Sequence, residues 1–148
     1  PGTAQNADRR TRRNVQVDVG ERIVLCGITA TPPSAEIHKT ALGAEDSVAW
    51  RYAESAVEIV KELRSQGVKV CCLEQTHNSV PLHQFRPSPD EVYAIVVGNE
   101  VEGVAQEVVD NADTVLEIPQ FGTKHSLNVA VSAGLALWHF LQSLHLRP

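Results

Sequence analysis

Residues 92–97 read VYAIVV, an almost uninterrupted apolar run, and residues 98–103 directly after it read GNEVEG. An apolar run without polar alternation is typical of a central strand that is buried on both faces of a parallel sheet. Shorter runs at 22–27, 68–73 and 114–118 predict three further strands. In a parallel sheet of this kind, ligands bind beyond the carboxyl ends of the strands, so the loops after these runs are the places where a site is expected.

Helical patterns lie between and after these strands. Residues 53–66 have the periodicity of an amphipathic helix and end before Gly67, a residue whose conformational freedom suits a helix stop. A shorter helix is predicted at 104–109, and a long one after Ser126, whose hydroxyl is an obvious N-cap. One side of the long helix carries Leu127, Val131, Leu135 and Trp138. The alternation of strands and helices predicts a single α/β domain with a mainly parallel sheet flanked by helices.

The composition of the 148 residues, with 43% hydrophobic and 21% charged residues, is that of an ordinary globular protein and argues against disorder of the whole chain. The most apolar stretch, 127–141, is shorter than a membrane-spanning helix requires, so no membrane association is expected. The cysteines Cys26, Cys71 and Cys72 lie in apolar runs and lack metal-binding spacing, which favours buried, reduced thiols in a cytoplasmic protein. No histidine pattern indicates a metal site.

Positive charge is concentrated at the N-terminal end, although the net charge of the chain is −5. Residues 1–13 contain four arginines and one acid, a local charge of +3. Such a cluster can contact the phosphates of a nucleic acid. A solvated tail without a ligand is the alternative, and charge alone favours it.

Two segments carry the residues from which a site could be built. The stretch GNEVEG at 98–103 places two glycines around two carboxylates at a turn from strand to helix, which favours a cationic or zwitterionic ligand read by main-chain groups. The stretch 118–131 reads IPQFGTKHSLNVAV, and its Asn128 enters an apolar helix, where its amide needs a partner. Lys124 could contact phosphate or be solvated.

Taken together, these two segments resemble the second and third motifs of the SpoU/TrmH methyltransferases of the SPOUT superfamily. Residues 25–33 (LCGITATPP), 39–45 (KTALGAE) and 73–76 (LEQT) resemble the short members of that family as well. The resemblance runs from about residue 21 to residue 141. It implies a C-terminal trefoil knot, a homodimer, and S-adenosylmethionine as the cofactor.

The resemblance also assigns roles to residues of this chain. The matching cofactor positions are Leu73, Gly98, Asn99, Glu100, Ile118, Gln120, Leu127 and Asn128. The implied reaction is methyl transfer to the 2′-hydroxyl of an RNA ribose, in tRNA or rRNA. Ser126 and Asn128 of the third motif assist that reaction. Positions expected to face RNA are Asn6, Arg9, Arg10, Arg12, Lys39, Arg51 and Lys124.

The first family motif, N-x-G-x-x-x-R, supplies the arginine that works at the 2′-hydroxyl, and here the chain departs from the pattern. The nearest match runs from Asn6 to Arg12, with Asp8 in place of the glycine, and Arg13 competes with Arg12 for the catalytic role. Residues 1–20 are therefore set apart as an atypical segment, either disordered or truncated, ahead of a methyltransferase domain at 21–148. The alternative function is a non-catalytic knotted domain that binds S-adenosylmethionine or RNA.

Overall fold

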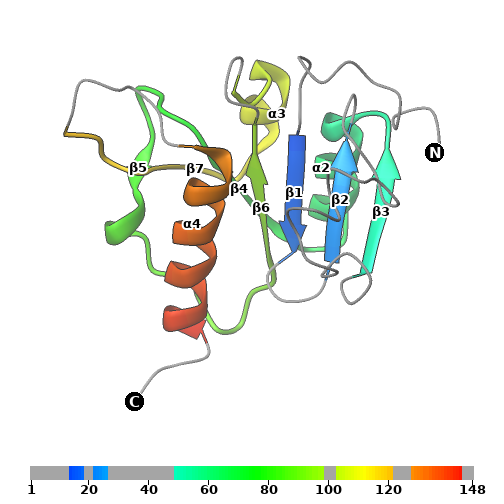
Figure 1. Cartoon of the computed structure of the whole chain (residues 1–148). Helices are drawn as coiled ribbons and strands as arrows, with labels where there is room; N and C mark the ends of the chain where they lie inside the picture. The colour runs from blue at the N-terminus through cyan, green and yellow to red at the C-terminus, as the bar shows by residue number, and fades with distance from the viewer. Residues whose placement is uncertain (1–13, 19–21, 27–48, 99–102, 122–127, 145–148) are drawn as a thin grey trace, which may run out of the picture.

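The computed structural model of the chain describes residues 14–18, 22–26, 49–98, 103–121 and 128–144. The strands are β1 (Asn14–Asp18), β2 (Arg22–Cys26), β3 (Ala49–Ala53), β4 (Lys69–Leu73), β5 (Val80–Pro81), β6 (Tyr93–Val97) and β7 (Thr114–Glu117). The helices are α2 (Ala56–Ser65), α3 (Gln106–Asn111), α4 (Val129–Leu144) and the 3-10 turn η3 (Leu82–Gln84). These strands form one sheet in the order β3-β2-β1-β6-β4-β7-β5 (Figure 1).

The sheet is parallel except for one strand. β6, β4, β7 and β5 are parallel neighbours, and so are β2 and β3. β1 lies between β2 and β6 and is antiparallel to both, so the strands on its two sides run in the same direction. The predicted α/β architecture with a mainly parallel sheet is confirmed, as are the strands expected at 22–27, 68–73, 92–97 and 114–118.

Three strands were not predicted. β1 has the alternating sequence NVQVD, a strand pattern that is short and directly follows the arginine cluster. Its five residues fall inside the segment 1–20 that the sequence sets apart, yet they are paired on both sides within the sheet. β3 takes residues 49–53, so the first predicted helix begins at Ala56, three residues later than expected. β5, with only two residues, lies in what the sequence indicated as a loop.

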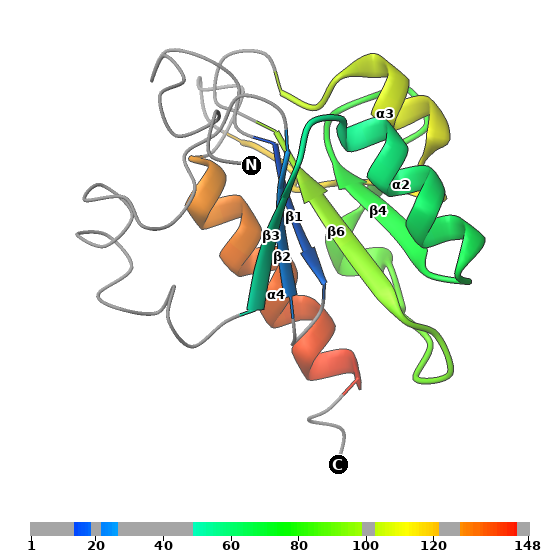
Figure 2. The same ribbon diagram turned by 90° about the vertical axis from the view of Figure 1, so that its right-hand side faces the viewer.

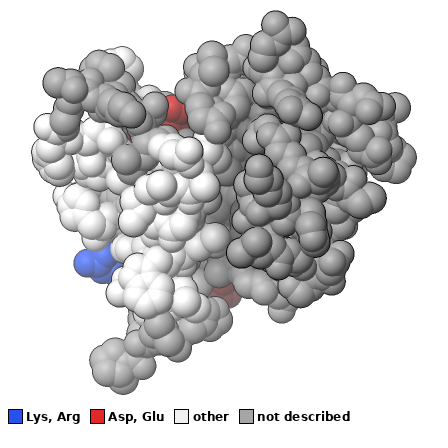
Figure 3. Space-filling model, viewed as in Figure 1, with Lys and Arg blue, Asp and Glu red and all other residues white. Residues whose placement is uncertain are grey.

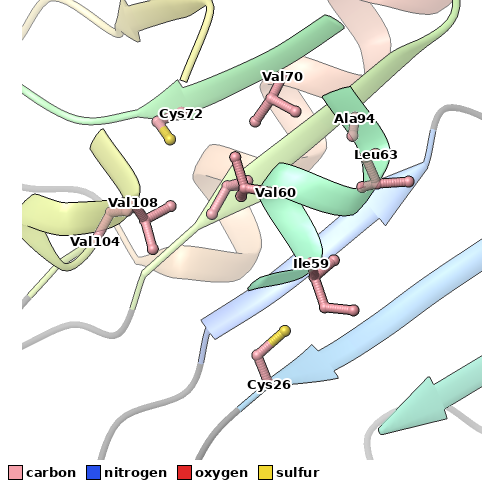
Figure 4. Packing of buried hydrophobic residues seen from close by; sticks show 10 residues of the cluster. Cys26, Ile59, Val60, Leu63, Val70, Cys72, Ala94, Val104 and Val108 are labelled. Carbon is pink, nitrogen blue, oxygen red and sulfur yellow. The ribbon is translucent and has the colours of Figure 1, made fainter. Parts of the chain in front are cut away.

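Helices cover both faces of the sheet, with α2 and α3 on one face and α4 on the other (Figures 1 and 2). The core is accordingly divided into two clusters. Ile59, Val60 and Leu63 of α2 pack with the strands on the first face (Figure 4). Ala136 and Phe140 of α4 pack on the second face. We call these two clusters the α2-side core and the α4-side core. β6 is buried along its whole length and supplies side chains to both clusters, which explains why residues 92–97 lack polar alternation.

α2 begins and ends where local chemistry dictates. The hydroxyl of Ser55 accepts a hydrogen bond from the N–H of Glu58 at 3.3 Å and caps the first turn. At the other end Gly67 adopts φ +86°, the conformation that side chains rarely tolerate. The N–H of Gly67 donates to the carbonyl of Arg64, and that of Val68 to the carbonyl of Leu63, each at 3.0 Å. The stop predicted at Gly67 is therefore confirmed.

Candidate functional site

The ends of three neighbouring parallel strands define the candidate site. β4 lies between β6 and β7, with Cys72 opposite Val96 and Leu73 opposite Leu116. This register brings Glu74, directly after β4, level with Gly98 after β6 and with Glu117 at the end of β7, and Ile118 lies one residue beyond that level. These residues at the carboxyl edge of the sheet form the candidate site, since the sequence predicts a ligand site at this edge.

The glycines at the two ends of the stretch 98–103 touch each other. Gly98 is buried, and a Cβ built on it would overlap the carbonyl group of Gly103 and the backbone nitrogen of Val104. Gly103 adopts φ +68°. Glycine is thus required at both positions, because the backbone at Gly98 lies too close to that of Gly103 and Val104 for a side chain. Asn99 and Glu100, which the family resemblance assigns to the cofactor, lie outside the described residues.

A carboxylate from the neighbouring strand holds this approach together. Glu74, half-buried directly after β4, accepts a hydrogen bond from the Val104 N–H on Oε2 at 2.9 Å. Its Oε1 accepts from the Gln75 N–H at 3.2 Å, and a Cβ on Gly103 would overlap Oε2. Glu74 belongs to the family-like stretch 73–76, but neither its residue type nor the resemblance predicted a role for it.

A second carboxylate, Glu117 at the end of β7, organises the loop that follows β4. The Ser79 hydroxyl lies 2.6 Å from Oε1 of Glu117 and 2.8 Å from the Thr76 carbonyl, so its single proton can be donated to either oxygen. The Gln75 side chain donates to Oε2 of Glu117 at 3.2 Å. The edge of the sheet therefore carries two adjacent carboxylates, which favour a cationic over an anionic ligand.

The segment after β7 contributes the remaining described positions. Ile118 is half-buried and packs against the α4-side core. The Gln120 amide nitrogen donates to the Ile118 carbonyl at 3.1 Å. Phe121 is 97% exposed. Two predicted site residues of this segment, Leu127 and Lys124, lie outside the described residues.

Asn128 caps α4. Its amide oxygen Oδ1 accepts a hydrogen bond from the Ala130 N–H at 2.8 Å, and its backbone carbonyl accepts the first helical bond from Ser132 at 2.9 Å. The prediction that Ser126 is the N-cap is wrong, because the helix begins at Val129 and the residue directly before it provides the capping oxygen. The sequence predicted that the Asn128 amide needs a hydrogen-bond partner. Its oxygen finds that partner in the first turn of its own helix, at the Ala130 N–H.

Figures 1 and 2 both place the start of α4 at the same edge of the sheet as the end of β6. The structure therefore brings together the described cofactor candidates, namely Leu73, Gly98, Ile118, Gln120 and Asn128. The expected catalytic and RNA-facing residues Arg12, Arg13, Ser126, Asn6, Arg9, Arg10 and Lys39 lie outside the described residues. Arg51, the one RNA-facing candidate that is described, forms an ion pair with Glu62 at 2.6 Å.

The three cysteines are not nucleophiles. Burial raises the pKa of Cys26 to about 11 and the pKa values of Cys71 and Cys72 to about 12, so all three thiols stay protonated near neutral pH. Among the described residues, no cluster of histidine, cysteine or acidic side chains is arranged to hold a metal ion. No helix in the described ranges has the length and apolar character needed to cross a membrane.

Comparison with known proteins identifies relatives across most of the chain. The family model described as SpoU rRNA Methylase family matches residues 3–138. The 23S rRNA (guanosine-2′-O-)-methyltransferase RlmB of Neisseria meningitidis is 31% identical over 104 residues, 70% of this chain and 40% of the relative. The tRNA (guanosine(18)-2′-O)-methyltransferase of Aquifex aeolicus is 32% identical over 92 residues, 60% of this chain and 43% of the relative. The chain thus spans about two fifths of the length of these curated relatives.

Solved structures share the fold. An AdoMet-bound rRNA methyltransferase from Sinorhizobium meliloti has a TM-score of 0.74 and 26% identity, and the match covers 84% of this chain and 46% of that one. The TrmH/SpoU tRNA modifying enzyme of Aquifex aeolicus has a TM-score of 0.72 and 24% identity, with coverage of 83% and 61%.

Proposed function

The chain belongs to the SpoU rRNA methylase family, and from this premise we propose that it is an S-adenosylmethionine-dependent 2′-O-ribose methyltransferase acting on tRNA or rRNA. The observation that carries the proposal is the carboxyl edge of β6, β4 and β7, where Gly98 and Gly103 of the first family-like segment touch each other and where the second segment begins after β7. Relatives named as rRNA and tRNA 2′-O-methyltransferases support the reaction and the class of substrate.

The residues at this edge fit S-adenosylmethionine, which carries a sulfonium and an ammonium group. Glu74 and Glu117 give the edge negative charge, which disfavours a phosphate ligand there. Leu73, Gly98 and Ile118 offer main-chain groups, and Gln120 a side-chain amide. Asn99, Glu100 and Leu127 complete the proposed set by the family resemblance. An AdoMet-bound relative with the same fold supports this assignment.

When bound, the cofactor supplies an electrophilic methyl group. The chain has to hold the ribose 2′-oxygen in line with that group, and orientation of this kind provides much of the rate. The ribose hydroxyl also has to release its proton, which passes to solvent, and the guanidinium of Arg12 or Arg13 of the opposite subunit is proposed to donate a hydrogen bond to that oxygen. Ser126 and Asn128 assist. Because Oδ1 of Asn128 is engaged in capping, its amide nitrogen is the group proposed to act as a donor.

We propose a homodimer that associates through α4. The outward face of this helix exposes Val131 (50%), Leu135 (44%), Trp138 (52%) and Leu141 (37%). The helix contains no charged residue, and the described surface on this side carries few charged side chains (Figure 3). An apolar stripe of this kind is typical of an interface. The trefoil knot expected from the family is proposed for the C-terminal part of the chain.

The extent of the domain and its location are proposals as well. The family match begins at residue 3 and β1 is paired within the sheet, which supports a domain that begins ahead of residue 21. The proposed RNA contacts remain Asn6 and the basic residues Arg9, Arg10, Arg12, Lys39 and Lys124, as the local charge supports. Three buried free thiols are compatible with a reducing compartment such as the cytoplasm.

The experiment that tests the function has two stages. Calorimetric titration with S-adenosylhomocysteine is expected to give one site per chain. Methyl transfer to a mixture of unmodified tRNA and rRNA is then measured for the wild type, Arg12→Ala and Arg13→Ala. Loss of transfer in one variant with unchanged cofactor binding supports the enzyme. Binding without transfer in the wild type would favour the alternative, a knotted domain that binds cofactor or RNA, and absence of binding would overturn the proposed function.

A further inference from the structure

Glu74 lies where it can control the shape of the glycine-bounded loop without belonging to it. Its Oε2 accepts a hydrogen bond from the N–H of Val104, a residue that is 7% exposed and belongs to the α2-side core. Val104 precedes α3 by two residues, so this N–H is not part of a helical hydrogen bond. A buried N–H without an acceptor is costly, and a charged acceptor forms the stronger kind of hydrogen bond. The carboxylate therefore stabilises the position of Val104 directly.

The same carboxylate oxygen also fills the space beside Gly103. A Cβ at Gly103 would overlap Oε2, and a Cβ at Gly98 would overlap the Gly103 carbonyl and the Val104 nitrogen. Glu74, Gly98, Gly103 and Val104 thus form one contact unit, which we call the loop clamp. Through the loop clamp, Glu74 at the end of β4 holds Val104, two residues before α3, in place beside Gly98, which directly follows β6. Gly98 and Gly103 are thereby held against each other.

We infer that Glu74 is a positioning residue that sets cofactor affinity through the loop clamp and makes no contact with the cofactor itself. The inference rests on the proposed function, because Gly98, Asn99 and Glu100 are among the proposed cofactor positions. A loop whose ends are fixed before binding loses less conformational entropy when the ligand binds. Removal of the clamp is therefore expected to weaken the cofactor and its demethylated product alike.

Three substitutions separate the reach of the side chain from its charge. Glu74→Gln keeps an oxygen at the same distance for the Val104 N–H but removes the charge. Glu74→Asp keeps the charge but is one methylene too short for that bond. Glu74→Ala removes both. The second hydrogen bond of Glu74, to the Gln75 N–H, is exposed, so water can replace it in each variant.

The first readout needs no ligand. Hydrogen exchange of the Val104 amide is expected to accelerate about tenfold or more in Glu74→Ala and Glu74→Asp, and to stay near the wild-type rate in Glu74→Gln. Glu117→Ala is the matched control: it removes the same side chain one strand away, where the partners are Gln75 and Ser79, and should leave Val104 unchanged. Equal exchange in all variants would overturn the clamp whether or not the protein binds cofactor.

The second readout is the dissociation constant for S-adenosylmethionine and for S-adenosylhomocysteine. We expect Glu74→Asp and Glu74→Ala to weaken both ligands by about tenfold and by the same factor, and Glu74→Gln to remain within about threefold of the wild type. A direct charge contact would instead weaken the sulfonium ligand selectively in Glu74→Gln, which would overturn the inference. Unchanged affinity in Glu74→Asp despite faster Val104 exchange would overturn it as well. Failure of the wild type to bind either ligand would count against the proposed function and leave the exchange test of the clamp standing.

Discussion

The two long helices on opposite faces of the sheet differ in their outward sides. α2 buries Ile59, Val60 and Leu63, and its exposed positions are Glu58, Lys61, Glu62, Arg64 and Ser65. α4 buries Ala136 and Phe140, but its exposed positions include Val131, Leu135, Trp138 and Leu141. The outward side of α2 is thus polar and suited to contact with solvent. The outward side of α4 is apolar like a protein core, yet no other described element of the chain covers it. The proposed dimer interface is therefore placed on this side.

The largest expected effect is the loss of stability when the buried side of α4 is altered, compared with the same kind of change on its exposed side. Phe140 is fully buried, with its ring 5.2 Å from Tyr93 and 5.7 Å from Phe85, centroid to centroid. Phe140→Ala should lower the free energy of unfolding by about 3–5 kcal/mol, because it removes a large side chain and leaves a cavity. Urea unfolding at two protein concentrations measures this loss, which is expected at both. Leu135→Ala on the outer face is the control, and its effect should shrink on dilution as the dimer dissociates. A small loss for Phe140→Ala would mean that α4 is not packed as described.

The intermediate effect concerns the outer face alone. Trp138→Glu places a charge in the exposed stripe and should weaken dimerisation about 30-fold or more, since a central tryptophan commonly contributes 2 kcal/mol or more to an interface. Sedimentation equilibrium is the measurement. Lys61→Glu, an equally exposed position on α2, is the matched control and should leave the association constant unchanged. A monomeric wild type, or a dimer insensitive to Trp138→Glu, would remove the proposed reason for the difference between the helices.

What the sequence predicts correctly in this molecule depends on local patterns. The run at 92–97, the stop at Gly67 and the strand that precedes Glu74 are each determined by neighbouring residues, through burial on both faces or through a positive φ. β1 and β3 were missed because NVQVD and AWRYA are not apolar runs, and part of their strand structure comes from pairing with distant residues, β1 with β6 and β3 with β2.

The site shows the same division. The carboxyl edge of the sheet and the importance of Gly98 and Gly103 follow from the order of strands and turns. The contact between Glu74 and Val104 does not, because it depends on the register that places the end of β4 level with the end of β6. The stripe on α4 was recognised as apolar, but periodicity alone could not tell which apolar face of that helix is buried against the sheet.

The smallest expected effect is at the start of α4, where Asn128 has both a structural and a proposed catalytic role. Asn128→Ala removes the capping oxygen and should lower stability by about 1 kcal/mol. Asn128→Asp keeps an oxygen at that place and adds a negative charge, which the N-terminus of a helix favours, so its stability should stay within about 0.5 kcal/mol of the wild type. Aspartate has no amide nitrogen, however, and the proposed donor is lost. We therefore expect Asn128→Asp to unfold like the wild type in urea while transferring methyl groups at least about tenfold more slowly. Full transfer by Asn128→Asp would leave Asn128 as a helix cap and nothing more, and equal destabilisation of both variants would contradict the cap.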